Sequence, residues 1–344
     1  MRKTELSTPA LVVDLDLMDT NIAAMQAAVS GAGKMLRPHA KAHKRVEIAR
    51  RQIAAGAAGM CCATLTEMES MVRSGIGVLL TTPVASRAKT DRIAAAAALG
   101  DVAVVVDHPL QVALLEAAGA KLTVLVDLDI GDHRTGVPCD ERAIALAVAV
   151  DASPNLRFGG LQAYSVSGSH TVGHAERIGH STAALSLAVG VQKELLRRGL
   201  DATRLTGGST GTWDIDIAIP ELTEMQAGSY PLMDVAYGKI GGVPFPVAMT
   251  LLATVISASH KDRVTVDAGF KAFATDRPFG PEAIGIPGCR WAWAGDEHGF
   301  LFADVLPGIG EQVAFVVPHC DPTVNLHEKL YACRGDEVVE VWTR

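Results

Sequence analysis

Residues 36–44, with the sequence LRPHAKAHK, carry nitrogen-bearing side chains at alternate positions, namely Arg37, His39, Lys41 and His43. If this run is a β-strand, these side chains share one face, because successive strand residues point to opposite sides. A lysine among cationic neighbours and partly removed from water has a lowered pKa, and its neutral amine can form a Schiff base with a carbonyl compound. A solvated basic edge is the alternative interpretation of the run alone.

Two small, hydroxyl-rich turns could hold a phosphate group. The first has the sequence TGGSTGT over residues 206–212, and the second is the tripeptide at residues 228–230. Glycines let backbone N–H groups approach a phosphate dianion, and hydroxyls add donors. The candidate ligands are Ser209, Thr210, Gly211, Thr212, Gly228, Ser229 and Tyr230. A lysine at one strand end and phosphate turns at two others would together hold a phosphorylated aldehyde cofactor, pyridoxal 5'-phosphate (PLP).

Three further residues are candidates for binding this cofactor. Arg134 lies on a loop bounded by Gly131 and Gly136, where a plain surface arginine is the alternative. Gln162 and Tyr164 alternate at the end of an apolar run, so an amide and a phenol share one face. A buried tyrosine usually packs in a core, but at the mouth of a barrel its hydroxyl can bond a cofactor ring.

A short motif near the C-terminus could hold a metal ion. His319 and Asp321 are two residues apart, so an extended chain directs both side chains the same way and Cys320 the other way. An imidazole with a carboxylate suits a divalent ion such as Mn²⁺, Mg²⁺ or Zn²⁺ and leaves coordination positions open for substrate or water. The same spacing also occurs without a metal.

The elements that must position these residues alternate along the chain. Apolar runs predict strands near 35–41, 59–64, 77–82, 101–107, 121–128, 156–163, 203–207 and 222–227. Helical periodicity falls between them, at 44–55, 65–73, 86–99, 109–118, 140–151 and 174–199, with a shorter helix after 211. Eight strands separated by helices predict an α/β fold of the (β/α)8 TIM-barrel type. An open doubly wound sheet is the competing architecture.

The pattern changes after about residue 245. Short β-rich segments separated by Gly, Pro and Asp turns predict a second, mostly antiparallel β domain. We therefore expect a PLP-binding barrel over residues 16–245 and a β domain over 246–344, with residues 1–15 packed on the β domain.

Composition limits the cellular context. The chain of 344 residues has a formal net charge of −7 and a pI of about 5.9, which does not favour nucleic-acid binding. Its six cysteines include no CxxC pair, which favours a reducing compartment over a disulfide framework. The N-terminal apolar stretch is too short for a signal peptide, and the alanine-rich runs are too short to span a membrane. We expect a cytoplasmic protein.

Taken in order, these motifs resemble the D-threonine aldolase and D-serine dehydratase family, relatives of alanine racemase. The resemblance implies a PLP barrel, a C-terminal β domain and a homodimer acting on an amino acid. By position it makes Lys41, rather than Lys44, the Schiff-base residue, and it makes His319 and Asp321 the metal ligands. Lys41, His319 and Arg134 are the expected catalytic residues. The matching segments are Thr8-Pro9-Ala10, RPHAKAHK, TGGSTGT, Gly228-Ser229-Tyr230, Asp267-Ala268-Gly269-Phe270-Lys271, DEHG and HCDPTVNL.

Within that family, dehydratases carry His-x-Cys and aldolases His-x-Asp, so Asp321 favours an aldolase that cleaves D-β-hydroxy-α-amino acids, of the D-threonine or D-3-hydroxyaspartate type, to glycine and an aldehyde. A dehydratase yielding a 2-oxo acid and ammonia is the alternative. A racemase would need Tyr331 as a second acid or base, and a PLP carrier would need no metal. One departure bears on the substrate: the family usually has a Gly and a His soon after Tyr164, where this chain has residues 165–170 with the sequence SVSGSH.

Overall fold

A computed structural model describes residues 1–343, and its contacts divide the chain into two compact units. The barrel unit comprises residues 24–41 and 46–228. The β unit comprises residues 1–23, residues 42–45 and the chain from Ser229 onward. Helix α1 (Leu15–Gly31) contributes residues to both. Each unit is described below by itself.

The barrel unit is built on eight parallel strands in the order β2-β10-β9-β8-β6-β5-β4-β3, with the short β7 (Val137–Pro138) added beside β6. A parallel bridge between His39 and Cys61 joins the two ends of this order. The expected barrel is therefore confirmed. The strands are β2 (Met35–Leu36), β3 (Met60–Cys62), β4 (Val78–Leu80), β5 (Val102–Val106), β6 (Leu122–Asp129), β8 (Leu156–Ala163), β9 (Leu205–Gly207) and β10 (Glu224–Met225).

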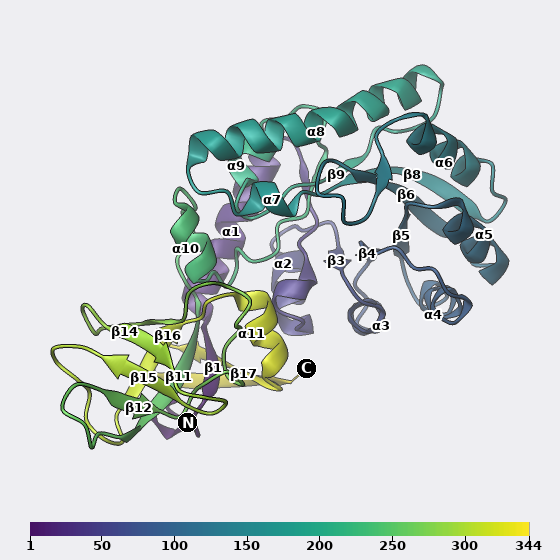
Figure 1. Cartoon of the computed structure of the whole chain (residues 1–344). Helices are drawn as coiled ribbons and strands as arrows, with labels where there is room; N and C mark the ends of the chain where they lie inside the picture. Colours follow the sequence, from purple (N-terminus) through teal and green to yellow (C-terminus); the bar gives the residue numbers. More distant parts are fainter. Residues whose placement is uncertain (344) are drawn as a thin grey trace. The chain divides into compact units, whose positions relative to one another are not determined.

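Helices alternate with these strands, as the periodicity predicts. Local signals set several of their ends: Thr64 and Glu67 form a reciprocal capping box at the start of α3, and Pro109 occupies the first turn of α5, where its missing N–H is not needed. The longest helix, α8, runs across the upper side of the view (Figure 1). The helices are α2 (Val46–Ala54), α3 (Leu65–Arg73), α4 (Arg87–Ala97), α5 (Pro109–Ala118), α6 (Glu141–Asp151), α7 (Val166–Ser169), α8 (His174–Arg197) and α9 (Trp213–Asp216).

The structure corrects the interpretation of residues 36–44 as one strand. Strand β2 ends at Leu36, and residues 40–42 form a 3-10 turn, so the four nitrogen-bearing side chains do not share a face. Pro38 lacks the N–H that a central strand would donate, which is consistent with the early end. Arg37 instead forms an ion pair with the buried Glu224 (Nε to Oε2, 3.0 Å), which Arg204 also contacts at 2.7 Å. Burial alone would raise the pKa of Glu224, but the two arginines lower it overall.

The β unit contains a mixed, mostly antiparallel sheet in the order β14-β15-β12-β11-β1-β17-β18, with β16 pairing both β11 and β13. Its only parallel pairing among the described residues joins β1 to β17. The strands are β1 (Ala10–Asp14), β11 (Met249–Ser257), β12 (Val264–Val266), β13 (Glu282–Ala283), β14 (Arg290–Trp293), β15 (Gly299–Phe302), β16 (Gln312–Val316), β17 (Lys329–Arg334) and β18 (Glu337–Thr343), and the helices are α10 (Val235–Ile240) and α11 (Cys320–Leu326).

The unit boundary differs from the expected one at residue 245. Residues 229–245 belong to the β unit, because their backbone bonds run to its strands and loops. The N–H of Val235 donates to the carbonyl of Val317, and the N–H of Ala248 donates to that of Leu232. Segment 10–14 is a strand of the same sheet, between β11 and β17.

Across residues 1–343, the structure contains no helix with both the length and the apolar character needed to cross a membrane.

Candidate active site

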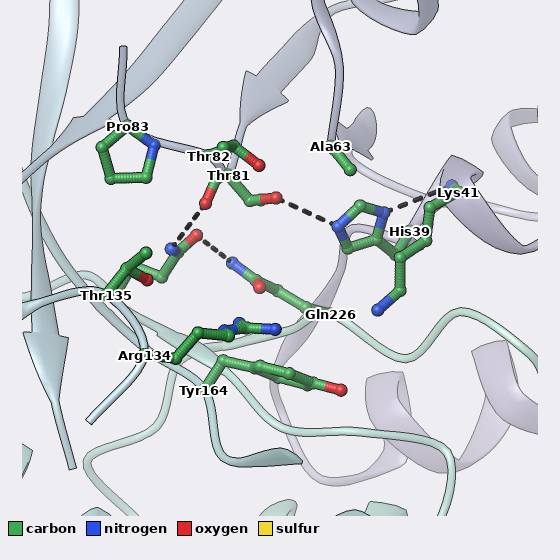
Figure 2. Close-up of a pocket in the computed structure, with 11 residues that line it drawn as sticks. His39, Lys41, Ala63, Thr81, Thr82, Pro83, Arg134, Thr135, Tyr164 and Gln226 are labelled. Atoms are coloured by element: carbon green, nitrogen blue, oxygen red, sulfur yellow. Dashed lines mark hydrogen bonds between the residues drawn. The ribbon is translucent and has the colours of Figure 1, made fainter. Parts of the chain in front are cut away.

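A cavity of about 280 Å³ opens in the barrel unit (Figure 2). None of the residues that line it carries a carboxylate, while two carry a permanent or potential positive charge in addition to a histidine. Its polar and cationic lining would suit a small anionic ligand. The lining residues are His39, Lys41, Ala63, Thr81, Thr82, Pro83, Arg134, Thr135, Gln162, Tyr164 and Gln226.

The ring of Tyr164 lies next to both cations. Lys41 Nζ is 5.3 Å from the ring centroid, and Arg134 Cζ is 5.5 Å from it. Figure 2 shows the Arg134 side chain extending along the tyrosine ring and the Lys41 side chain reaching into the same space. Both distances fall within the range of attractive cation–π contacts. The aromatic face thus holds an amine and a guanidinium at the cavity without placing a carboxylate there.

His39 has both ring nitrogens engaged by protein atoms. The backbone N–H of Lys41 donates to Nδ1 at 3.3 Å, so Nδ1 is an acceptor and Nε2 carries the proton. Nε2 lies 3.0 Å from Thr81 Oγ1, and that hydroxyl donates in turn to the carbonyl of Cys62 at 3.1 Å. The ring is therefore neutral in this arrangement. The ring accepts from the backbone of Lys41 and lines the cavity.

A buried carboxylate lies behind the cavity. Asp127 accepts from Gln162 Nε2 at 2.8 Å and from Thr135 Oγ1 at 3.0 Å. Burial raises the pKa of Asp127 to about 6. Gln162 also donates to the carbonyl of Thr81 at 3.2 Å and accepts from Gln226 Nε2 at 3.2 Å. Both amide protons of Gln162 are thus used inside the protein, and Asp127 orients two of the lining side chains.

The first predicted phosphate turn lies in the same unit but does not line the cavity. We expected the Ser209 and Thr212 hydroxyls to donate to phosphate, but they bond each other (2.9 Å), and Thr212 donates to the buried Asp216. The Gly208 backbone has φ +78°, and an added Cβ would lie 2.8 Å from Asp216 Oδ2. The backbone of the turn therefore sits directly against this carboxyl group. Gly228, the last residue of the barrel unit, does not line the cavity either.

The second predicted turn continues into the β unit. Ser229 Oγ donates to Asp321 Oδ2 at 3.1 Å, so this hydroxyl contacts a predicted metal ligand. Tyr230 is fully buried and its ring packs 5.9 Å from that of Phe245. A phosphate role for these two residues stays a prediction.

His319 and Asp321 come together, although not on an extended strand as the sequence predicts. His319 has extended backbone angles, and helix α11 begins at the next residue, with Asp321 in its first turn. His319 Nε2 lies 3.9 Å from Asp321 Oδ2, and its Nδ1 lies 2.7 Å from Asp276 Oδ2. Because a carboxylate can only accept, Nδ1 donates to Asp276, and in the neutral ring Nε2 is then the nitrogen with a lone pair. That nitrogen faces Asp321, as a metal-binding pair requires.

Cys320 is a poor ligand candidate. Its thiol is buried, and burial raises its pKa well above the usual range, so it carries its proton and donates to Asp321 Oδ2 at 3.2 Å. Among residues 1–343, no cluster of three or more His, Cys, Asp or Glu side chains is arranged to hold a metal ion. A site here would therefore use two protein ligands and leave its other positions open.

Sequence reasoning missed four aspartates that position candidate site residues: Asp127, Asp216, Asp234 and Asp276. Asp234 caps α10 and accepts from the backbone N–H of Cys320 at 2.8 Å, which braces the His319 segment. Its place before the apolar Val235 is an N-cap signal that could have been found. Asp276 carries no comparable signal, since only the fold brings it to His319.

Fold and cavity together define a barrel protein with a lysine amine in a polar cavity. A family model described as "Alanine racemase, N-terminal domain" matches residues 13–213, and one described as "Putative serine dehydratase domain" matches residues 248–333. The chain belongs to the alanine racemase N-terminal domain family, and the resemblance seen in its motifs is confirmed.

Several named relatives match nearly the whole chain. D-threonine aldolase of Arthrobacter sp is 37% identical, covering 98% of this chain and 92% of the relative. 3-Hydroxy-D-aspartate aldolase of Paracoccus denitrificans (strain Pd 1222) is 33% identical, with coverages of 99% and 92%. The crystal structure of D-threonine aldolase from Filomicrobium marinum has a TM-score of 0.97 at 36% identity, covering 100% of this chain and 96% of that one.

A dehydratase is also related. D-threo-3-hydroxyaspartate dehydratase of Delftia sp. (strain HT23) is 30% identical, covering 98% of this chain and 97% of the relative. Structures of such a dehydratase, with a TM-score of 0.91 at 27% identity, cover all of this chain and 96% or more of theirs. They include a histidine-to-alanine and a cysteine-to-alanine variant at positions two residues apart, the latter in a metal-free form. That spacing equals the spacing of His319 and Asp321.

Proposed function

We propose that this protein is a metal-assisted aldolase that cleaves D-β-hydroxy-α-amino acids to glycine and an aldehyde. Its family and relatives make it a PLP-dependent lyase. The substrates named for the relatives, D-threonine and 3-hydroxy-D-aspartate, define the class of substrate that we propose here. The homodimer expected from the resemblance is part of the proposal and is measured by light scattering.

The barrel cavity fits the cofactor. At about 280 Å³ it is near the lower end of ligand-site volumes, as a single substituted pyridine ring requires. Lys41 would hold the cofactor through its amine, with Tyr164 and Arg134 beside it. When bound, PLP acts as the electron sink for cleavage at the α-carbon. The chain contributes a fixed amine, a permanent cation and an oriented amide network that keeps these side chains in place.

One observation carries the metal part of the proposal: His319 directs Nε2 at Asp321 while Asp276 occupies Nδ1. The two residues would hold a divalent ion, which supplies Lewis acidity toward a substrate hydroxyl. Asp321 provides a hard oxygen ligand, which favours Mn²⁺ or Mg²⁺ over ions that prefer sulfur. Ser229 donates to the same carboxylate and fixes its orientation.

The dehydratase is the second candidate, favoured by the relative in the Delftia strain. We favour the aldolase because the residue two after His319 is an aspartate, whereas the dehydratase variants identify a cysteine at that spacing. A racemase is disfavoured, since Tyr331 packs against a hydrophobic cluster that includes Val12 and Leu252. A PLP carrier would have no use for the His319–Asp321 pair.

A product assay tests the proposal. The holoprotein is incubated with D-threonine and with D-3-hydroxyaspartate, with Mn²⁺ added and in parallel with a chelator. Glycine and an aldehyde that form only with the metal support the aldolase. A 2-oxo acid and ammonia would instead identify a dehydratase. In the same assay Asp321→Ala should lose most of the turnover while cofactor absorbance persists, and full activity of this variant in chelator would overturn the metal-assisted mechanism.

A further inference from the structure

Asp216 lies outside the predicted phosphate motif TGGSTGT but contacts the turn of residues 208–212. Its side chain is buried, and it ends helix α9, which packs beside α8 (Figure 1). Asp216 Oδ2 accepts from the backbone N–H of Ser209 at 3.3 Å and from the Thr212 hydroxyl. Its other oxygen accepts from the hydroxyl of Ser181 on α8. One carboxyl group therefore ties the turn to a long helix of the barrel unit.

The direction of these hydrogen bonds follows from the number of protons. Burial raises the pKa of Asp216 only to about 6, so at neutral pH the carboxylate accepts and does not donate. The single hydroxyl proton of Thr212 points to Asp216. The bond of 2.9 Å between Ser209 and Thr212 must then use the proton of Ser209. The hydroxyl protons of Ser209 and Thr212 are both directed inward, so these two side chains are not donors of the turn, whereas its backbone N–H groups can be.

The turn begins at the edge of the cavity. The carbonyl of Gly207 accepts from the backbone N–H of Gln226 at 2.7 Å, and Gln226 lines the cavity. A Cβ added at Gly207 would lie 1.9 Å from the carbonyl oxygen of Ala163, the residue before Tyr164. The end of strand β9 is thus packed too closely for any side chain at Gly207. A shift of the turn that follows would therefore change the position of this turn relative to the residues that line the cavity.

We propose that Asp216 is a positioning residue that holds this turn in the conformation that binds the phosphate group of the cofactor through backbone N–H groups. The proposal deepens the proposed function and rests on it. A rigid turn is needed because backbone donors, unlike flexible side chains, cannot adjust once the chain is misplaced. Asp216 touches neither cofactor nor substrate in this proposal and acts only through residues 209–212.

The test compares two ligands that differ by the phosphate group alone. The full-length apoprotein is titrated with PLP and with pyridoxal, and the ratio of the two affinities is measured from the change in visible absorbance. In Asp216→Ala the ratio should fall by about tenfold or more, the usual effect of losing a buried, charge-assisted hydrogen bond. Asp216→Asn keeps an acceptor for Ser209 and Thr212, so it should retain the ratio within about threefold.

Asp214→Ala is the matched control, because this carboxylate also lies on α9 but forms a solvent-exposed hydrogen bond with His174 at 2.7 Å. Its ratio should equal that of the wild type. If Asp216→Ala does not fold, Asp216→Ser takes its place with the same expected loss, since a serine cannot reach both the turn and Ser181. An unchanged ratio in the folded variant overturns the proposal alone. A wild-type protein that binds neither ligand overturns the proposed function as well.

Discussion

The imidazole of His319 and the carboxylate of Asp276, 43 positions apart in the chain, meet at 2.7 Å between Nδ1 and Oδ2. A histidine held in this way keeps one tautomer and one ring orientation, and the other nitrogen becomes a better metal ligand. Asp276 itself is partly exposed, so its contribution is to the orientation of His319 and not to the core.

We expect Asp276→Ala to weaken Mn²⁺ binding by about 10- to 100-fold, the usual effect of removing a carboxylate that orients a metal-binding histidine. The free Mn²⁺ signal in electron paramagnetic resonance measures this affinity with the metal alone. Asp262→Ala is the control, because this exposed aspartate pairs only with its neighbour Arg263 in the described contacts. Equal Mn²⁺ affinity in Asp276→Ala and wild type would contradict the metal assignment of His319.

Lys41 and Lys44 should differ completely as cofactor ligands. Lys41 Nζ lies over the Tyr164 ring in the cavity, whereas Lys44 Nζ donates to Asn325 in the β unit at 2.9 Å. Lys41→Ala should abolish the visible absorbance band of lysine-bound cofactor, and Lys44→Ala should leave it intact. Absorbance spectra of the two purified variants decide the matter. An absorbance band that persists in Lys41→Ala would contradict the assignment of Lys41 as the cofactor-binding lysine.

His39 should act on the cofactor through the backbone of Lys41. An asparagine at this position can accept from the N–H two residues later, as Nδ1 of His39 does at 3.3 Å, whereas an alanine cannot. We expect His39→Ala to weaken PLP binding by about three- to tenfold and His39→Asn to weaken it less, in line with the loss of one hydrogen bond. Equal losses in both variants, measured by absorbance titration, would show that the ring surface matters more than the hydrogen bond.

Asp127 should make the stability of the apoprotein depend on pH. Burial raises its pKa to about 6, from an ordinary value of about 4. Between these pH values the unfolded chain releases the proton and the folded chain keeps it, so this group lowers stability as pH rises through that window and adds nothing further above it. A shift of two pKa units corresponds to about 3 kcal/mol.

Asp127→Asn cannot ionise, so its free energy of unfolding should rise relative to that of the wild type, by up to about 3 kcal/mol between about pH 4 and about pH 6.5. Urea unfolding at several pH values gives the difference between the two proteins, in which contributions from all other groups cancel. Parallel pH profiles would mean that Asp127 ionises as readily in the folded state as in the unfolded one.

The sequence alone determined the order of elements and the chemistry of the motifs. Strands and helices of the barrel follow from local periodicity, and capping signals such as Thr64 with Glu67 set helix ends, because these depend on residues a few positions apart. The cavity residues Lys41, Arg134 and Tyr164 could be named because βα units place strand ends at one face of a barrel.

Only the tertiary structure decided which polar groups meet. The alternation in residues 36–44 predicted one cationic face, yet Arg37 bonds Glu224, whose position depends on the closure of the barrel. By residue type the hydroxyls of Ser209 and Thr212 were available donors to a phosphate, but Thr212 donates to Asp216 and the proton of Ser209 is directed to Thr212. Asp276 reaches His319 through the packing of the β unit. The contacts of Arg37 and His319 join residues far apart in sequence, and a polar group bonds the partner that the fold supplies, so the local pattern does not predict them.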